Sequence, residues 1–277
     1  MPFSDLLTDP YQVEFYRNET DRILLGPGTP YMMLELQGLD IPLVRYTDFD
    51  LPADDGSFFP VQDSLDTRKV NGKFLIEANL GAASAMAIDN LVRVVRPANF
   101  LMYCSFLIPG REKLYVAGRP RRLNYDKERL ELSGVTPADF QFVAADPTIY
   151  SVDQQSIGIT LDVGENSESL VVFHNGTYLS PPTFSIVGPA TDPRLTNVTF
   201  NNRQIKVDVV LGAGDTLAID VLNRTVRLNG VSRYDLVRSD NQWWEVLPGQ
   251  QTITYSRTGT TGSSPMTMTY RKAFVAV

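Results

Sequence analysis

The stretch WWEVLPGQQTITYS, residues 243–256, joins two adjacent tryptophans to a Pro-Gly pair and then to an alternating strand pattern. Neighbouring side chains of an extended chain point to opposite faces, so Trp243 and Trp244 cannot both form one flat platform. We expect one ring in a core and the other under a loop or at an interface; a sugar-stacking ring is the less favoured interpretation. The Pro-Gly pair at 248–249 then reverses the chain and returns the alternating residues to a sheet.

The same alternation recurs along the chain and predicts a mainly β protein. Apolar side chains at every second position are typical of half-buried strands in antiparallel sheets. The Asn-Gly pairs at 71–72, 175–176 and 229–230 predict tight reversals between such strands. Strands are expected from this pattern at residues 11–17, 203–210, 215–220, 224–230, 251–256 and 265–271.

One segment has a helical period instead. Residues 82–96, AASAMAIDNLVRVVR, place apolar side chains at spacings of three and four before Pro97 prevents continuation. We expect this to be the only long helix, with Asn79 as its cap and an exposed pair between Asp89 and Arg93. The apolar stripe predicted to face a sheet consists of Ala83, Met86, Ala87, Leu91, Val94 and Val95.

The length of 277 residues favours two domains. The segment 142–151 ends with an Asp-Pro break, and residues 151–169 carry few large apolar side chains before short strands begin near Leu170. We therefore expect a β-barrel or sandwich-like first domain at 1–150, containing helix 82–96. An all-β sandwich or jelly roll should follow at 151–277.

Composition limits the possible partners. The net charge of −7, from 25 Lys and Arg against 32 Asp and Glu, disfavours a surface that grips nucleic acid through its phosphates. The single cysteine, Cys104, excludes an intramolecular disulfide, and the N-terminus lacks a signal-peptide pattern, so synthesis in a reducing cytoplasm is expected. No apolar run is long enough to predict a membrane span.

His174 is the only histidine, which restricts catalysis. A His-rich zinc site is impossible, and a serine or cysteine hydrolase would have to use His174 as its base. The residue directly precedes an Asn-Gly pair, so we interpret it as a strand-end side chain near the surface. No common hydrolase or metal motif is present, and the sequence predicts no enzyme and no catalytic, metal or cofactor-binding residue.

Three further segments are interpreted structurally. The acidic residues between 48 and 66 do not follow the order of an EF-hand, which favours a solvated hairpin loop over a calcium site. GPGTP at 26–30 lacks the features of a phosphate loop and predicts a turn between strands. The basic stretch 118–129 is diluted by Asp126 and Glu128 and is interpreted as a solvated loop or a subunit contact.

The C-terminal run GDTLAIDVLNRTVRLNG, continued by the tryptophan stretch, resembles the second domain of the distal tail proteins of phages with long, non-contractile tails. The specificity lies in the order of the elements: a strand, a short hairpin and then the Trp-Trp and Pro-Gly pairs. The matching residues are Gly214, Asp215, Leu217, Asp220, Arg224, Val226, Asn229, Gly230, Trp243, Trp244, Leu247, Pro248 and Gly249.

The first half is similar to the same family in its segment 34–60, in the position of its helix, and in residues 118–125 and 142–151. The resemblance implies a structural virion protein made in the bacterial host cytoplasm. Its N-terminal domain would form a ring, usually hexameric, and its galectin-like C-terminal domain would face outward. The implied partners are the tail tube, the tail-tip hub, the tape measure and the receptor-binding proteins.

The resemblance also suggests how such a ring works. The first domain's sheet edges and helix 82–96 would supply contacts between subunits. We expect the acidic residues at 48–55 to face the lumen or rim, where they would repel DNA that passes without specific binding. The alternative function is a carbohydrate-binding module that recognises a receptor.

Overall fold

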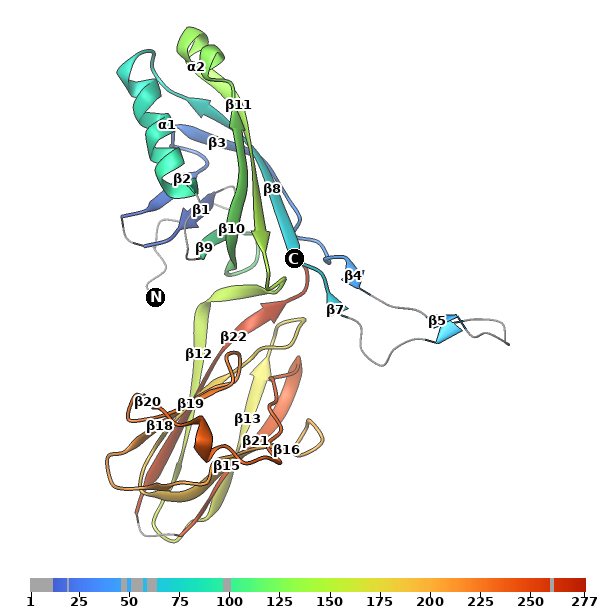
Figure 1. Ribbon diagram of the computed structural model, residues 1–277, viewed down its shortest axis with the longest axis vertical. Coiled ribbons are helices and arrows are strands. Elements are labelled where there is room, and N and C mark those ends of the chain that lie inside the picture. The colour runs from blue at the N-terminus through green and yellow to red at the C-terminus, as the bar shows by residue number, and fades with distance from the viewer. Residues whose placement is uncertain are drawn as a thin grey trace. The chain divides into compact units, whose positions relative to one another are not determined.

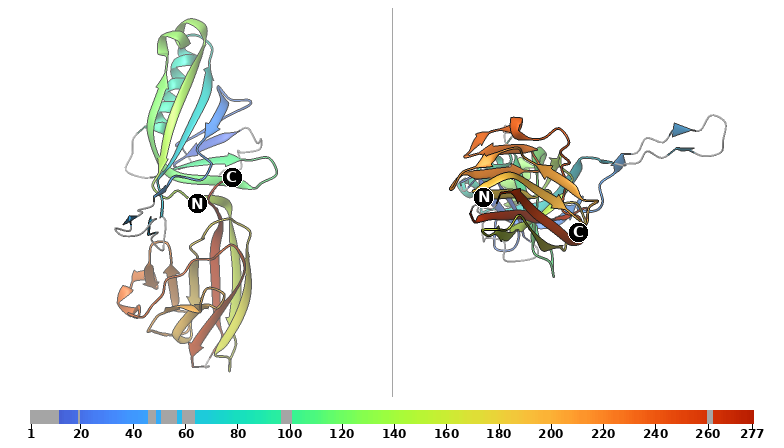
Figure 2. Two further views of the ribbon diagram at one scale, coloured as in Figure 1. Left: turned by 90° about the vertical axis from the view of Figure 1, so that its right-hand side faces the viewer. Right: turned by 90° about the horizontal axis from the view of Figure 1, so that it is seen from below.

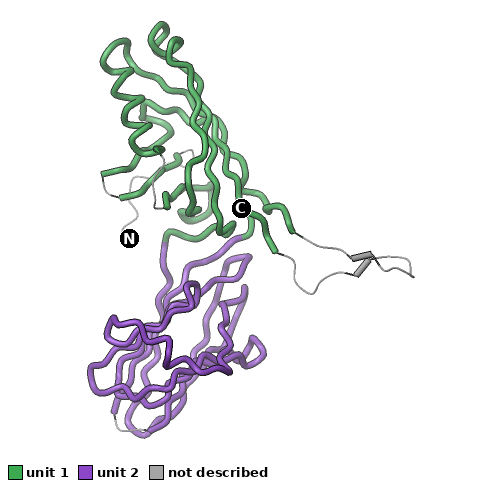
Figure 3. Tube along the Cα trace, viewed as in Figure 1, with its two compact units in different colours: residues 1–152, 275–277 green, residues 153–274 purple. Residues whose placement is uncertain are grey.

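The computed structural model describes residues 12–18, 20–45, 64–96, 101–259 and 262–277, and the backbone alone of 49–50 and 57–58. The chain is mainly antiparallel β, as predicted (Figure 1). It divides into two compact units (Figure 3). Unit 1 comprises Met1–Val152 and Val275–Val277, and unit 2 comprises Asp153–Phe274. The last three residues thus belong with the first unit, whereas the sequence had placed them in the second domain.

Unit 1 is built around one long strand that belongs to two sheets. The first half of β10 (Lys113–Tyr125) pairs with β9 (Met102–Leu107), and its second half pairs with β11 (Val135–Ala144). The change falls at Gly118, where a Cβ atom would lie 2.4 Å from the Val143 carbonyl oxygen. Glycine is needed there because the two backbones approach too closely for a side chain.

The other strands of unit 1 extend these two sheets. On one side, β1 (Val13–Tyr16) pairs with β9 and with β2 (Arg22–Leu25). On the other, β8 (Arg68–Glu77) pairs with β11 and with β3 (Tyr31–Gln37). Two short hairpins lie between β3 and β8 in the chain: β4 (Val44–Arg45) with β7 (Ser64–Leu65), and β5 (Phe49–Asp50) with β6 (Ser57–Phe58).

Helix α1 spans Ala82–Val95, in the segment where the sequence predicts one, but its details differ. Its N-cap is Gly81, with no side-chain cap, so the expected capping role of Asn79 is wrong. The buried face is formed by Ser84, Ala87, Leu91, Val94 and Val95. Ala83 and Met86 are exposed, so their predicted place in the stripe facing the sheet is wrong: the packed face is the one that Leu91, Val94 and Val95 share.

The expected ion pair within the helix is also replaced by a tertiary one. Arg93 Nε lies 3.9 Å from Asp21 Oδ1, and Asp21 also lies 4.0 Å from Arg96. The carboxylate before β2 therefore attracts Arg93 away from Asp89. The contacts of Asp21 with Arg93 and Arg96 form where the last turn of α1 packs near β2. The spacing of residues within the helix cannot predict such a contact.

A second helix, α2 (Lys127–Ser133), lies within the basic stretch that the sequence assigned to a loop. Asp126 caps it, because its Oδ1 accepts a hydrogen bond from Arg129 N at 3.0 Å. Gly134, with φ of 71°, ends it in the left-handed conformation. The prediction of a solvated loop is therefore wrong, and the rest of the stretch lies in β10, whereas α1 is the only long helix among the described residues, as expected.

Unit 2 consists of two antiparallel sheets that share one core. One contains β12 (Ile149–Leu161), β22 (Ser264–Phe274), β14 (Thr183–Val187), β18 (Thr216–Asp220), β19 (Thr225–Leu228) and β20 (Val231–Ser232), in that order. The other contains β13 (Ser167–His174), β21 (Gly249–Thr258), β15 (Ala190–Asn197) and β16 (Arg203–Lys206), with β17 (Val210–Leu211) paired to β15. A short 3-10 helix follows at Tyr234–Leu236.

The beginning of unit 2 corrects the sequence analysis. Short strands were expected only from about Leu170, but β12 forms a strand of 13 residues across 149–161. It runs beside β22, the last strand (Figures 1 and 2). Few large apolar residues are needed here, because only Ile159 and Leu161 near the end of β12 enter the unit 2 core as buried side chains.

The Asn-Gly pairs at 229–230 and 71–72 behave differently. Asn229 and Gly230 have φ of 50° and 81° and connect β19 to β20, as expected for a tight hairpin. The pair at 71–72 lies inside β8, so the predicted reversal there is wrong. Gly72 is required for space instead, since its Cβ would lie 2.1 Å from the Phe140 ring.

Arg68 in unit 1 and Arg257 in unit 2 are buried arginines that each bind four backbone carbonyls. In unit 1, Arg68 donates to the carbonyl oxygens of Pro147, Gly38, Asp40 and Val275 at 2.6–2.8 Å. In unit 2, Arg257 donates to those of Glu165, Pro189, Leu161 and Asp162 at 2.7–3.3 Å. The two guanidinium groups each join distant segments of their own unit, and carbonyl dipoles stabilise the buried charges.

Candidate assembly surfaces

A large hollow in unit 1 lies beside α1, and we call it the α1 groove. It has a volume of about 990 Å³ and is lined by residues of α1, by the turn between β2 and β3, and by the segments that flank β8 and β11. Tyr31 fixes the helix along it, because its hydroxyl donates to Ala87 O at 2.7 Å. Burial raises the pKa of Tyr31 to about 12, so this donor remains protonated at neutral pH.

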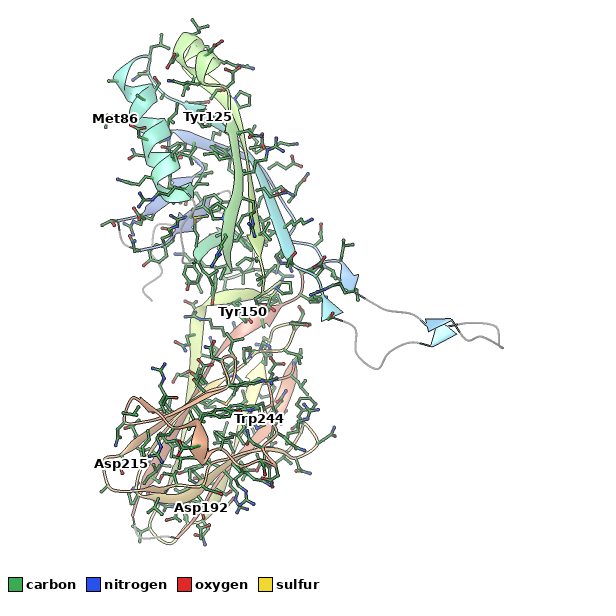
Figure 4. All side chains as sticks on the ribbon, in the orientation of Figure 1. Met86, Tyr125, Tyr150, Asp192, Asp215 and Trp244 are labelled. Carbon is green, nitrogen blue, oxygen red and sulfur yellow. The ribbon has the colours of Figure 1, made fainter. Side chains whose placement is uncertain are left out.

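The rim of the α1 groove is apolar and open. Met86, labelled in Figure 4, is 64% exposed and Leu80 is 60% exposed; both line the groove together with the exposed Ala83. Exposed apolar side chains gathered around a hollow are typical of association sites. Of the contacts that the resemblance implies, helix 82–96 therefore offers a suitable surface.

A smaller cleft lies on the other side of α1, and we call it the arginine cleft. It has a volume of about 190 Å³ and combines cationic and apolar side chains from the end of α1 and from β10. Arg121 forms no ion pair with any described residue, whereas Arg122 Nε lies 3.7 Å from Asp139 Oδ2. Its lining consists of Val92, Val95, Arg96, Pro120, Arg121, Arg122 and Leu123.

Strand β3 provides an unpaired sheet edge. Among the described strands it is hydrogen-bonded only to β8. Met32 and Leu34 on this strand are 48% and 56% exposed. An edge strand with exposed apolar side chains is a template for pairing with another chain. The edge of β3 is therefore a specific candidate for the sheet-edge contacts that the resemblance implies.

His174 is buried, and the prediction that it lies near the surface is wrong. It does end a strand, β13, but its ring packs edge-on against Tyr270 at 5.9 Å. Its Nε2 lies 2.7 Å from Tyr178 O and therefore donates, which leaves Nδ1 to accept from Gly176 N at 3.3 Å. Burial lowers the pKa of His174, and the neighbouring Lys272 lowers it further. Both ring nitrogens of His174 are hydrogen-bonded to backbone atoms, so the imidazole has a structural role.

The tryptophans separate as the sequence predicts. Trp244 is 1% exposed, donates from Nε1 to Leu195 O at 3.2 Å, and meets Phe184 edge-on at 5.3 Å (Figure 4). Trp243 is partly buried and packs against the outside of the same core. Neither ring is placed as an exposed stacking platform, so a glycan site would have to use other residues of unit 2.

The remaining predictions have mixed outcomes. GPGTP forms the expected turn between β2 and β3, closed by a hydrogen bond from Gly26 N to Tyr31 O. The acidic residues at 48–55 and Asp63 lie outside the residues whose side chains are described; only Asp66 is, at 3.7 Å from Arg45. In the described ranges, no three His, Cys, Asp or Glu side chains gather as metal ligands. Neither described helix has the length and hydropathy of a membrane span.

These observations define a mainly antiparallel β protein of two units with surfaces suited to association. Residues 175–274 match the family model of the siphovirus-type tail component, C-terminal domain. The predicted resemblance to the siphophage distal tail proteins is therefore confirmed, and the matched residues all lie in unit 2. No curated protein matches the chain.

Solved structures extend the likeness in fold to most of the chain. The crystal structure of the SPP1 Dit (gp 19.1) protein, described as a paradigm of the hub adsorption apparatus in phages that infect Gram-positive bacteria, aligns with a TM-score of 0.68. The identity is 15%, and the alignment covers 88% of this chain and 93% of that one. The subviral particle of infectious bursal disease virus VP2 aligns with a TM-score of 0.19, which supports no argument.

Sequence reasoning missed the arginine cleft. The basic residues at 121–122 were recognised, but Arg96 comes from the end of α1 and joins them only through the packing of the helix against β10. Nothing in the spacing between 96 and 121 indicates this proximity. The α1 groove was missed for a related reason, because its far wall comes from the segments around residues 78 and 134.

Proposed function

We propose that this chain is a structural component at the distal end of a long, non-contractile phage tail, where it forms a hexameric ring that joins the tail tube to the tail-tip hub. The observation that carries this proposal is the match of residues 175–274 to the siphovirus-type tail component. The proposal places the protein in the virion after its synthesis in the bacterial cytoplasm. It assigns no catalytic step and no cofactor to the chain.

A ring requires two different surfaces on each subunit, because a rotation that closes must bring one patch against another. The α1 groove and the β3 edge of unit 1 are candidates for these surfaces, since both expose apolar side chains. The tail tube, the hub and the tape measure and receptor-binding proteins are the proposed neighbours. The net charge of −7 supports passage of DNA through the ring without adhesion.

Negative-stain microscopy of the purified full chain tests the proposal, and closed rings are the expected result. Met86→Glu places a charge on the rim of the α1 groove and should reduce ring formation if this surface is used. Leu222→Glu, at a 60% exposed position of unit 2, is the matched control and should leave the rings intact. A wild-type chain that remains monomeric at high concentration would argue against self-assembly.

A second candidate function is receptor recognition through a carbohydrate. Its support is an open hollow of about 790 Å³ on the outer face of β14, β18, β19 and β22. The hollow is lined by hydroxyl groups such as Thr183, Ser185 and Thr267, with Asp220 and Arg227 nearby. Sugar hydroxyls are bound by such hydrogen-bonding groups. Binding of the full chain to a glycan array, abolished by Arg227→Ala, would support this function; a silent array would count against it.

A further inference from the structure

The arginine cleft carries more positive charge than its neighbours neutralise. Arg93 and Arg96 share one carboxylate, Asp21, at 3.9 and 4.0 Å, and these are the outer limits of an ion pair. Arg17 adds a further charge below the surface, where its Nη2 donates to Arg96 O. Burial lowers the pKa of Arg17, the nearby Arg96 lowers it further, and Asp21 opposes both effects.

The cleft is also partly apolar. Its walls include Val92, which is 40% exposed, together with Pro120 and Leu123. A ligand that fits must therefore supply carboxylates beside apolar or aromatic groups. A nucleic acid would fit the charge but not the apolar walls, and the net charge of −7 opposes its approach.

The chain itself contains one segment with this chemistry. Residues 46–63, YTDFDLPADDGSFFPVQD, carry acidic side chains and phenylalanines and contain no Lys or Arg. The acidic and aromatic residues are Asp48, Phe49, Asp50, Asp54, Asp55, Phe58, Phe59 and Asp63. Five carboxylates in one segment account for most of the net charge of −7. The cleft and the segment are therefore complementary in both charge and apolar character.

We propose that the arginine cleft of one copy binds the acidic segment 46–63 of a neighbouring copy. This inference rests on the proposed ring, because a contact between two different patches of the same chain is the heterologous kind that a closed ring requires. It gives Arg96, Arg121 and Arg122 the role of binding carboxylates between subunits. Such pairs direct the approach of the partner and set the register of the contact.

The test exchanges charges between the two sides. Variant X carries Arg121→Glu and Arg122→Glu, and variant Y carries Asp54→Arg and Asp55→Arg. Each variant alone places like charges opposite one another between copies, so association should weaken about tenfold or more. Sedimentation velocity of the full chain, compared with wild type at equal concentration, measures this loss. The control, Arg194→Glu with Arg224→Glu at exposed positions of unit 2, should associate like wild type.

Mixing the variants shows whether the contact joins different copies. In an equimolar mixture, the unchanged cleft of Y meets the unchanged segment of X, and the two reversed sites also match, so alternating assemblies should recover. A segment bound within its own chain would give no recovery on mixing. Wild-type association of variant X, or of variant Y, would overturn the inference and leave the ring proposal standing. Wild-type association of Y is the result expected if residues 48–55 face the lumen. A monomeric wild type would overturn both.

Discussion

Replacement of Trp244 by alanine should destabilise unit 2 far more than the same change at Trp243. Trp244 is 1% exposed, whereas Trp243 covers only the outside of the core. Removing a large buried aromatic ring costs about 3–5 kcal/mol. The loss also leaves Leu195 O without its indole donor, for about 1 kcal/mol more. A total of about 4–6 kcal/mol corresponds to a fall of about 15–25 °C in the melting temperature of unit 2.

Far-UV circular dichroism is the suitable assay, because tryptophan fluorescence changes with the substitution itself. The two units can unfold in separate transitions, so only the transition assigned to unit 2 is compared. Trp243→Ala should cost about 1–2 kcal/mol, in keeping with partial burial. Trp244→Phe keeps a ring near Phe184 and should fall between the two. Equal losses for the two alanine variants, or a larger loss at Trp243, would refute the assignment of Trp244 to the core.

Three further predictions follow from buried groups. Arg257→Met should lower the stability of unit 2 by about 3 kcal/mol, because four carbonyls lose a charged donor; calorimetry should show the unit 1 transition unmoved, and movement of both would contradict separate units. The lowered pKa of His174 means that the unfolded chain binds the proton more readily, so the stabilising contribution is complete above about pH 6.5 and is lost as the pH falls below it. Urea unfolding across this range should show that slope and His174→Gln should lack it; identical slopes would exclude His174 as the cause. Gly72→Ala should cost about 1–3 kcal/mol, since its Cβ would lie 2.1 Å from the Phe140 ring, whose edge-on contact with Phe15 restricts its movement; an unchanged denaturation midpoint would show that the ring can shift.

The sequence was sufficient where the signal is local. The strands at 215–220 and 224–230 and the Asn229-Gly230 turn were predicted because alternation and backbone conformation are read from a few adjacent residues. The same rule, carried two residues further, would have placed His174 correctly. Leu170, Val172 and His174 occupy alternate positions of β13 and all three are buried. The Asn-Gly pair after His174 was given more weight than the alternation of buried residues within the strand.

Other features depend on contacts between distant segments. The capping signal of α2 was present, because Asp126 and Gly134 bracket a short helical run, but the charges between them favoured a loop. By contrast, no local pattern shows that β10 leaves one sheet for another at Gly118. The docking face of α1 is similar: its period predicts a helix, but the partner strands decide that Met86 stays outside.

The two units differ in what supports their roles. The family match begins at residue 175 and lies wholly in unit 2, whereas the α1 groove, the β3 edge and the arginine cleft all belong to unit 1. Assembly surfaces change with the partner they must fit, while a buried core must keep its packing, so a core stretch such as 243–256 is the easier one to recognise from sequence. The charge exchange at the arginine cleft therefore tests unit 1, which lies outside the family match and whose role must be argued from its surface residues.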